Sequence, residues 1–557
     1  MRGVNWGSRS KLPPYIPLLP LNVKSLRDVN INEALDVVKP DLDLLRASGI
    51  NVVRLLVMWK ALEPIPRVDF SQRSADTTAY LEALKQIVDR LYYDEHIFVI
   101  LDFHQDIAHE NFGGDGFPDW AVSNQISAPN RNDSTWGFNY YDIPIYDRWL
   151  CRIIASGSCG ALGSSVRATL NAFWNNAALD REASEKYGVH DTEIRLRDHL
   201  EKTIGDVARY FVDHPGVIGY EPFNEPHPVG IDKKEFEGKI LANFYSETLA
   251  EIRRHDKRAF LFVEPQVDWS TYDADGPEYG RFSFTRNPKS FLPIPFMNDD
   301  TRVIFSFHYY DPKLVVGFPF KRDMHKRERA WPITFAQLRK AATDRGLIPF
   351  LSEFGCGQDW QDKTNLLPAI YRGSTTRACM DMQYKQIEVQ LLNATYWNYD
   401  LYNSKSEGDN WNHEDNSLLG PDHIPRNMDI ITRPYPMRSS AKPKLIAFDL
   451  ASKNAAIILE GPLESDAPTV IFVPRKIHYS GADFEVRATS RSILWDEANS
   501  LLFWIPDPAL AKNQLLISPL GHFNPNAIPA ESRTLLNQIA FKMIVGADKP
   551  VPIVETN

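Results

Sequence analysis

The chain has 557 residues and a net charge of −10 at pH 7. Nucleic-acid binding depends on clustered Lys and Arg, so this acidic balance argues against a polyanionic partner. No run of 18 or more uncharged apolar residues is present to span a bilayer. Hydrophobic residues make up 43% of the chain, an ordinary globular value, and the length exceeds one typical domain.

Strand-like runs alternate with helical patterns up to about residue 435. The predicted strands are short apolar runs at residues 4–6, 52–57, 97–101, 217–223, 260–263, 303–307, 348–351 and 394–397. The predicted helices lie between them at residues 41–48, 78–92, 194–212, 243–254, 335–343 and 380–392. Eight strands in this alternation predict an α/β fold of the (β/α)8 TIM barrel type.

A long insertion separates the third strand from the helix at 194–212. It is rich in Gly and Asn and contains four tryptophans, Trp120, Trp136, Trp149 and Trp174. Loops of this length are usually functional or disordered, and the aromatic content favours an ordered wall of a cleft.

The pattern changes after Arg-Pro-Tyr-Pro at 433–436. Short β-rich runs recur with turn residues between them, which predicts a small antiparallel β-sandwich. We therefore expect a catalytic barrel domain over residues 1–436 and a C-terminal β-sandwich domain over residues 437–557.

Two glutamates stand where buried strands end. Glu225 lies in Gly-Tyr-Glu-Pro-Phe-Asn-Glu-Pro at 219–226, and Glu353 lies in Pro-Phe-Leu-Ser-Glu-Phe-Gly at 349–355. Pro or Gly ends each apolar run and places a carboxylate at the carboxyl end of a strand, where parallel barrels carry their active sites. Glycosidic bond cleavage needs two carboxyl groups, one protonated and one ionised. The sequence therefore predicts a glycosidase in which Glu225 and Glu353 lie within about 5 Å of each other.

Arg54 interrupts an otherwise apolar strand. An unpaired charge there would cost several kcal/mol, so we expect Arg54 to contact a carboxylate in the barrel mouth. A structural ion pair away from the site is the alternative.

Further polar or aromatic residues end other strands. His104 and Asp106 end the third strand, and His308 and Tyr310 end the sixth. We expect them to bind sugar hydroxyls or to orient a catalytic carboxylate. Trp397 ends the last strand and is expected to form the floor of the sugar site, with core packing as the alternative.

His104, Asp106 and His109 also form a possible set of metal ligands. Their spacing matches no standard zinc motif, and the strand end offers no clear third ligand. We therefore predict no metal and no other cofactor.

Four cysteines, Cys151, Cys159, Cys356 and Cys379, show neither CxxC spacing nor the density of a disulfide scaffold. Cys151 and Cys159 either close a small loop in an oxidising compartment or remain thiols. Cys356 lies three residues after Glu353 and is predicted to be a small buried hydrophobic residue rather than a nucleophile.

The chain begins Met-Arg-Gly-Val-Asn-Trp, without the charged and apolar regions of a secretory signal. We expect that the protein stays inside the cell or that a leader precedes this sequence.

The strand ends together resemble glycoside hydrolase family 5, a retaining (β/α)8 family. The resemblance rests on Asn-Glu-Pro at 224–226, His-Tyr-Tyr at 308–310, Ser-Glu-Phe-Gly at 352–355 and Trp397. Four further segments are similar to the endoglycoceramidase and glycosylceramidase branch: His-Gln-Asp at 104–106, Gly-Gly-Asp-Gly-Phe-Pro-Asp-Trp at 113–120, Asp-Asn-Trp-Asn-His-Glu-Asp at 409–415 and Arg-Pro-Tyr-Pro at 433–436. The resemblance covers residues 2 to about 436, and that branch also carries a C-terminal sandwich.

The resemblance implies catalytic roles. Glu225 would be the general acid/base, and Glu353 the nucleophile that forms the glycosyl-enzyme. Asn224 would hold the sugar 2-hydroxyl. Tyr310 would hydrogen-bond Glu353 and keep it ionised, while Arg54 adds positive charge nearby.

The resemblance also implies a sugar pocket. His104, Asp106 and Trp397 would line it at the cleavage point. Lys11 matches the basic residue that this branch places after strand one, with Arg9 as the alternative.

The branch acts on a β-linked sugar headgroup joined to a lipid, which implies a glycolipid substrate. Residues 313–322 read Lys-Leu-Val-Val-Gly-Phe-Pro-Phe-Lys-Arg, and Lys326, Arg327 and Arg329 follow. We expect this segment, 313–329, to touch an anionic membrane surface transiently or to shelter an acyl chain. Packing of its Phe residues on the barrel is the alternative.

The resulting hypothesis is retaining hydrolysis of a β-glycosidic bond between glucose or galactose and a lipid aglycone, with ceramide first and sterol second. Two alternatives remain: an endo-β-glucanase that acts on soluble β-glucans in an open groove, and a carbohydrate-binding protein without catalytic activity.

Overall fold

The computed structural model describes residues 1–110, 114–122, 164–189, 194–266, 300, 302–311, 324–358, 367–404, 408–409, 411, 414–479, 484–489, 492–522 and 554–555. Trp136, Trp149 and the cysteines at 151 and 159 lie outside these residues, as does the segment 313–323. Across the described ranges, no helix combines the length and the apolar character that crossing a membrane requires.

Eight parallel strands close into a barrel, each paired with its neighbours in chain order, and the last pairs with the first. They are β1 (Arg2–Trp6), β2 (Val52–Met58), β3 (Phe98–His104), β4 (Val217–Glu221), β5 (Phe260–Val263), β6 (Val303–Tyr309), β7 (Ile348–Phe354) and β8 (Asn393–Tyr399). The predicted TIM barrel is confirmed. Several strands run two or three residues further than predicted, so that polar residues expected after β3, β6 and β7 lie on the strands themselves.

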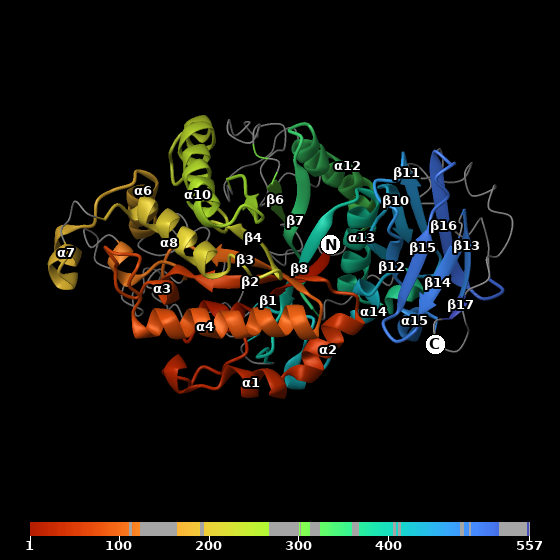
Figure 1. Ribbon diagram of the computed structural model, residues 1–557, viewed down its shortest axis with the longest axis horizontal. Helices are drawn as coiled ribbons and strands as arrows, with labels where there is room; N and C mark the ends of the chain where they lie inside the picture. The colour runs from red at the N-terminus through yellow and green to blue at the C-terminus, as the bar shows by residue number, and fades with distance from the viewer. Residues whose placement is uncertain are drawn as a thin grey trace.

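Helices follow the strands and cover the outside of the barrel (Figure 1). The α-helices in the described part of the chain are α1 (Ile31–Val37), α2 (Lys39–Ala47), α3 (Trp59–Leu62), α4 (Ala75–Asp89), α6 (Ser164–Trp174), α7 (Arg181–Tyr187), α8 (Leu196–Tyr210), α9 (Lys233–Glu235), α10 (Ala242–His255), α12 (Met324–Thr343), α13 (Thr375–Val389) and α14 (Met428–Ile431), with α15 (Arg475–His478) among the strands of the C-terminal part.

Helix α12 begins at Met324, whereas the sequence predicts a start at residue 335. Pro332 lies inside the helix, which is unusual because proline lacks the N–H group that a helix interior needs. Tertiary contacts hold the earlier turns: Trp331 is buried, and Arg327 is buried with its Nε 2.7 Å from Asp311 Oδ2. Arg327 is therefore not one of the exposed cations that the sequence predicted for a membrane-facing segment.

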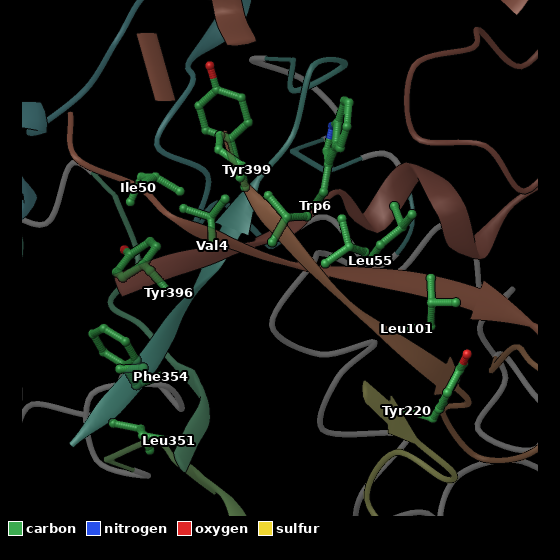
Figure 2. Packing of buried hydrophobic residues seen from close by; sticks show 14 of the residues in the cluster. Val4, Trp6, Ile50, Leu55, Leu101, Tyr220, Leu351, Phe354, Tyr396 and Tyr399 are labelled. Atoms are coloured by element: carbon green, nitrogen blue, oxygen red, sulfur yellow. The ribbon is translucent and has the colours of Figure 1, made fainter. Parts of the chain in front are cut away.

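Side chains alternate between the inside and the outside of the barrel along each strand. Outward residues join the main core beneath the helices, part of which Figure 2 shows around Val4, Leu55, Leu101, Tyr220 and Tyr396. A separate apolar layer fills the inside of the barrel with Val52, Ile100, Phe262, Ile304 and Phe350. Two residues further along these strands, the buried positions are polar, with Arg54, Asp102, Glu264, Ser306 and Ser352. A buried polar layer therefore lies above an apolar one inside the barrel.

Two sheets form the C-terminal part. One has the order β10-β11-β16-β13 and the other β17-β14-β15-β12-β9. Their strands are β9 (Tyr435–Arg438), β10 (Lys442–Phe448), β11 (Ala455–Glu460), β12 (Thr469–Phe472), β13 (Phe484–Ala488), β14 (Ser492–Asp496), β15 (Leu501–Ile505), β16 (Lys512–Pro519) and β17 (Val554–Glu555). All pairs are antiparallel except β14 with β17, and Phe484 packs on Trp495 across the two sheets, so the predicted sandwich is confirmed. The domain division at residue 436 stays a prediction. It would fall inside β9, which spans Tyr435–Arg438.

The sandwich packs beside α13 and α14 (Figure 1). Arg433 is buried at this junction, with its Nε 2.6 Å from Glu388 Oε1 and its Nη1 2.8 Å from Asp381 Oδ1 on α13. The Tyr435 hydroxyl donates to the carbonyl of Gly49 at 2.6 Å. Ion pairs and hydrogen bonds thus join the sandwich to the outer helices of the barrel.

Two tryptophans in the described part of the insertion are buried. Trp120 and Trp174 are 2% and 1% exposed, so they do not form the cleft wall that the sequence predicts. The indole of Trp174 lies 4.9 Å from the ring of Phe223, which directly precedes Asn224 in the chain. Trp174 therefore packs beneath the segment that carries Asn224 and Glu225, whereas Trp120 packs on Trp59 and His199.

A disulfide joins Cys356, just after β7, to Cys379 on α13. The predicted burial of Cys356 is correct, but its interpretation as an unpaired hydrophobic residue is wrong. The packing of α13 against the end of β7 brings the two cysteines together, although they lie 23 positions apart in the chain.

Replacing Cys356 and Cys379 together by Ala is expected to lower the free energy of unfolding by about 3 kcal/mol, because the bridge restricts the unfolded chain. Denaturant unfolding of both proteins checks the loss. Peptide mapping without reductant checks the bridge itself, and free thiols at both positions in the native protein would contradict it.

Candidate active site

The two glutamates that the sequence pairs lie together at the carboxyl ends of the strands. Glu353 is on β7, and Glu225 follows β4 by four residues. One carboxylate oxygen of each lies within 4.8 Å of the other and of a His308 ring nitrogen. Both carboxyl groups are almost fully buried, at 7% and 5% exposure for Glu225 and Glu353. Retaining glycosidases separate their two carboxyl groups by about 5 Å, and this arrangement suits that chemistry.

Glu225 has an unusual backbone and a buried carboxyl group. Its φ is 47°, in the left-handed region that non-glycine residues rarely adopt. Its backbone N–H donates to Glu264 Oε2 at 3.2 Å, and its Oε1 lies 2.9 Å from His308 Nδ1. Burial is the largest cause that raises the pKa of Glu225, and the nearby charge of Glu353 raises it further. The hydrogen bond and charge of His308 oppose the shift. A raised pKa favours the protonated form that a general acid requires.

Glu353 accepts a hydrogen bond on each oxygen. Arg54 Nη1 donates to its Oε1 at 2.7 Å, and the Tyr310 hydroxyl donates to its Oε2 at 2.9 Å. These contacts fix the carboxylate in one orientation and stabilise its negative charge. Both contacts are among those that the sequence predicts for Arg54 and Tyr310.

Arg54 lies fully buried at the centre of the polar layer. Beyond Glu353, its guanidinium contacts a set of acceptors from four other elements of the barrel: Asn5 Oδ1 at 2.9 Å, Asp102 Oδ1 at 3.0 Å, Glu221 Oε2 at 2.6 Å, Asn224 Oδ1 at 2.8 Å and Glu264 Oε1 at 3.6 Å. The predicted carboxylate contact is therefore one of several, and Arg54 neutralises charge across the whole layer.

Replacing Arg54 by Met is expected to lower stability by about 3–5 kcal/mol, because it leaves Asp102 and Glu221 buried without their cation. Denaturant or thermal unfolding measures the loss. Arg181→Met is the matched control, since Arg181 pairs with Glu185 on an exposed helix face, where an ion pair contributes less than about 1 kcal/mol. Similar losses in the two variants would contradict the prediction.

His308 lies between the Glu225–Glu353 pair and the polar layer. Its Nδ1 faces Glu225 and lies 3.6 Å from Glu353 Oε2, and its Nε2 lies 3.3 Å from Glu264 Oε1. Burial disfavours the charged ring, but the carboxylates of Glu264 and Glu353 hold the pKa of His308 well above its usual range.

Asn224, which directly precedes Glu225, is held by its neighbours. Its Oδ1 accepts from Arg54, and its Nδ2 donates to the carbonyl of Gln105 at 3.1 Å. Gln105 in turn donates to the Asn224 carbonyl at 2.7 Å. The side chain that the resemblance assigns to a sugar hydroxyl is thus preoriented.

The predicted sugar-pocket residues form one group. The ring of His104 stacks on Trp397 at 5.7 Å, and its Nδ1 and Nε2 lie 2.6 Å and 3.3 Å from Asp102 and Asp106. The Lys11 ammonium lies 2.5 Å from Asp106 Oδ2 and 4.6 Å from the centre of the Trp397 ring. Lys11 is therefore beside Asp106, whereas Arg9 donates to the carbonyls of Leu12 and Pro13 instead.

The histidines considered as metal ligands separate in the structure. His104 and Asp106 lie with Asp115, while His109 lies with Glu110 and Asp119. His109 Nε2 is 2.9 Å from Asp119 Oδ1. The absence of a metal stays a prediction.

Two buried glutamates in contact with Arg54, Glu264 and Glu221, are not among the residues predicted from the sequence. The signal was present, because Glu264 follows the apolar run of β5 and precedes Pro265, as Glu225 precedes Pro226. Glu221 ends β4 in the same way, before Pro222.

Comparison with known proteins places the chain in a family. The model of cellulase, glycosyl hydrolase family 5, matches residues 26–403, and the model of the glycoside hydrolase family 5 C-terminal domain matches residues 433–515. Endoglycoceramidase I of Rhodococcus hoagii (strain 103S) is 33% identical over 453 residues, which span 79% of this chain and 72% of that protein.

Two solved structures share the whole architecture. A ganglioside GM3 complex of endo-glycoceramidase II from Rhodococcus sp. has a TM-score of 0.62 at 19% identity, covering 94% of this chain and 97% of that one. Sterylglucosidase 1 of Cryptococcus neoformans has a TM-score of 0.67 at 16% identity, covering 94% and 95%. At these identities, the likeness shows the fold alone. From the family models and the Rhodococcus hoagii relative, the chain belongs to glycosyl hydrolase family 5 and is a glycoside hydrolase that acts on O-glycosyl bonds.

Proposed function

We propose that the protein hydrolyses the β-glycosidic bond between a glucosyl or galactosyl headgroup and a lipid aglycone by a retaining double displacement. The observation that carries the mechanism is the pair of buried carboxyl groups within 4.8 Å in unlike surroundings. Burial and the charge of Glu353 raise the pKa of Glu225, which favours its protonated form, whereas Glu353 receives Arg54 and Tyr310 as donors.

In the first step, Glu353 attacks the anomeric carbon while the carboxyl proton of Glu225 passes to the glycosidic oxygen. The bond to the aglycone breaks, the aglycone leaves as an alcohol, and a covalent glycosyl-enzyme forms on Glu353. Asn224 holds the sugar 2-hydroxyl through a contact that tightens as the ring flattens.

In the second step, Glu225 is a carboxylate and acts as the general base. It takes a proton from a water molecule, whose oxygen attacks the anomeric carbon and releases Glu353. The two inversions leave the sugar with its original configuration. Lys11, His104, Asp106 and Trp397 line the pocket at the cleavage point in this proposal.

The lipid aglycone is proposed from the endoglycoceramidase relative and from the branch motifs in the sequence. Assay of the purified protein against gangliosides, monohexosylceramides, steryl glucosides and soluble β-glucans, side by side, tests it. We expect release of sugar from a ceramide glycoside to be fastest. Release from the β-glucan alone would overturn the lipid assignment and leave the hydrolytic mechanism standing.

Membrane contact through residues 313–329 stays a proposal. Residues 313–323 lie outside the described structure, and the buried Arg327 contributes no surface charge. Arg329 is exposed on α12. Binding to vesicles that contain anionic lipid, measured for the protein and for an Arg329→Glu variant, would test this surface.

A further inference from the structure

Glu264 is a buried carboxyl group at the rim of the barrel, directly after β5. It continues the inward face of that strand, two residues beyond Phe262 of the interior apolar layer. Its main chain is held in place by one side chain of α10: the Tyr245 hydroxyl donates to the Glu264 carbonyl at 2.8 Å and accepts from the Glu264 N–H at 3.1 Å. A buried charge in so fixed a position needs specific partners, since burial without them is costly.

The carboxyl group of Glu264 reaches Glu225 by two routes. Its Oε2 accepts a hydrogen bond from the backbone N–H of Glu225 at 3.2 Å. Its Oε1 lies 3.3 Å from Nε2 of His308, and the other ring nitrogen of His308 lies 2.9 Å from Glu225 Oε1. One side chain thus contacts the main chain of Glu225 directly and its carboxyl group through an imidazole.

The main-chain contact acts where the backbone is strained. A non-glycine residue at φ 47° lies in a sparsely populated region of backbone conformations and persists there only where surrounding contacts hold it. The bond from the Glu225 N–H to Glu264 is such a contact. It keeps the side chain of Glu225 aimed from the end of β4 toward Glu353.

The imidazole contact acts on the proton. A carboxylate at Nε2 favours the doubly protonated ring of His308, in which both nitrogens are donors. Nδ1–H then donates to Oε1 of Glu225, so Oε1 is the acceptor oxygen and the acidic proton of Glu225 resides on Oε2. With a neutral ring that accepts at Nδ1, the proton of Glu225 would instead be held by the imidazole.

The charges around Glu264 come from several elements of the barrel. They are Arg54 on β2, Glu221 on β4, Glu225 after β4 and His308 on β6. Arg54 Nη2 at 3.6 Å and His308 Nε2 at 3.3 Å both face Oε1, and an N–H faces Oε2. Burial and the charge of Glu221 raise the pKa of Glu264 to about 8, whereas His308 and Arg54 oppose this shift. Donor groups nevertheless face both oxygens, and this geometry fits the carboxylate, which is an acceptor only.

We propose that Glu264 is a positioning residue for the acid/base group: it holds the strained backbone of Glu225 and, through His308, directs the transferable proton of Glu225 to Oε2. This inference rests on the proposed role of Glu225 as general acid/base. It adds to the predicted site a residue that touches no reacting atom.

A comparison of two leaving groups tests the proposal. A dinitrophenyl β-glycoside departs without protonation, whereas an alkyl β-glycoside of the same sugar needs the general acid. For Glu264→Gln, we expect kcat/KM to fall by about 30-fold or more with the alkyl glycoside and by less than about 3-fold with the dinitrophenyl glycoside. A purely structural role would lower both values by the same factor, and that result would overturn the proposal, as would unchanged values for both.

Glu201→Gln is the matched control. Glu201 is buried on α8, and burial raises its pKa to about 8, but it lies in an outer helix and pairs with Arg197. We expect no change in leaving-group dependence in this variant. If Glu264→Gln does not fold, Tyr245→Phe carries the test, because it removes both hydrogen bonds to the Glu264 main chain and should produce a smaller loss with the same selectivity. Equal losses with both substrates in Tyr245→Phe would then overturn the proposal.

Glu225→Ala in the same assay distinguishes a failure of the acid/base role of Glu225 from a failure of the positioning role of Glu264. If this variant shows no leaving-group dependence, the acid/base assignment itself fails. If it shows the dependence and Glu264→Gln does not, only the role of Glu264 fails.

Discussion

Replacement of Glu353 by Gln is expected to lower kcat/KM for an aryl β-glycoside by a factor on the order of 10⁴ or more, which is about 5 kcal/mol of transition-state stabilisation. An amide is a poor nucleophile, and it offers one acceptor oxygen where the carboxylate offers two to Arg54 and Tyr310. The covalent intermediate therefore cannot form on residue 353. Steady-state kinetics with a dinitrophenyl glycoside measure this loss without involving the general acid.

The assignment of Glu353 has a second test that does not depend on the variant's fold. A fluorinated sugar that forms a slow glycosyl-enzyme should label the wild-type protein at one peptide, the one that contains Glu353. Thermal unfolding of Glu353→Gln shows whether its fold is intact. Activity within about 10-fold of wild type in a folded variant, or label on a different peptide, would remove Glu353 from the nucleophile's role.

Replacement of Glu225 by Ala is expected to produce a loss that depends on the leaving group. General acid catalysis contributes about 10²–10⁴-fold, so kcat/KM for an alkyl or lipid glycoside should fall by that range. The value for a dinitrophenyl glycoside should change little, because its departure requires no proton. The raised pKa of Glu225 gives the wild-type protein a basic limb above the usual carboxyl range, and that limb should vanish in the variant.

Azide provides the control for the second step. It attacks the glycosyl-enzyme without a general base, so it should restore turnover of the dinitrophenyl glycoside by Glu225→Ala and yield the β-glycosyl azide. The same addition should not rescue Glu353→Gln, which forms no intermediate. Rescue of neither variant, with equal losses on both leaving groups for Glu225→Ala, would refute the acid/base role of Glu225.

Local signals in the sequence were sufficient for the barrel and for the two glutamates. Apolar runs of three to seven residues predict each strand, and Pro or Gly beside Glu225 and Glu353 marks where the runs end. Parallel strands that close into a barrel bring their carboxyl ends to one rim, so residues distant in the chain are expected to meet there. Because Arg54 interrupts an apolar strand, its charge was expected to contact a carboxylate at the same rim.

The tertiary structure decided the partners that local patterns leave open. The Cys356–Cys379 bridge depends on where α13 packs against the end of β7, and the burial of Trp174 depends on the segment beside Asn224. The start of α12 before Pro332 depends on Arg327, which is held by Asp311 from another element.

Glu264 shows the same division between chain and fold. The sequence alone indicates that Glu264 ends a strand, because it lies between an apolar run and a proline. Its contacts with Arg54, Glu225 and His308 exist only once the barrel brings the carboxyl ends of β2, β4, β5 and β6 to one rim. The physical reason is the distance over which each effect acts. Hydrophobic periodicity and turn residues act over a few positions in the chain. A buried charge is stabilised by the groups that the closed barrel places within about 4 Å of it, however distant they are in sequence.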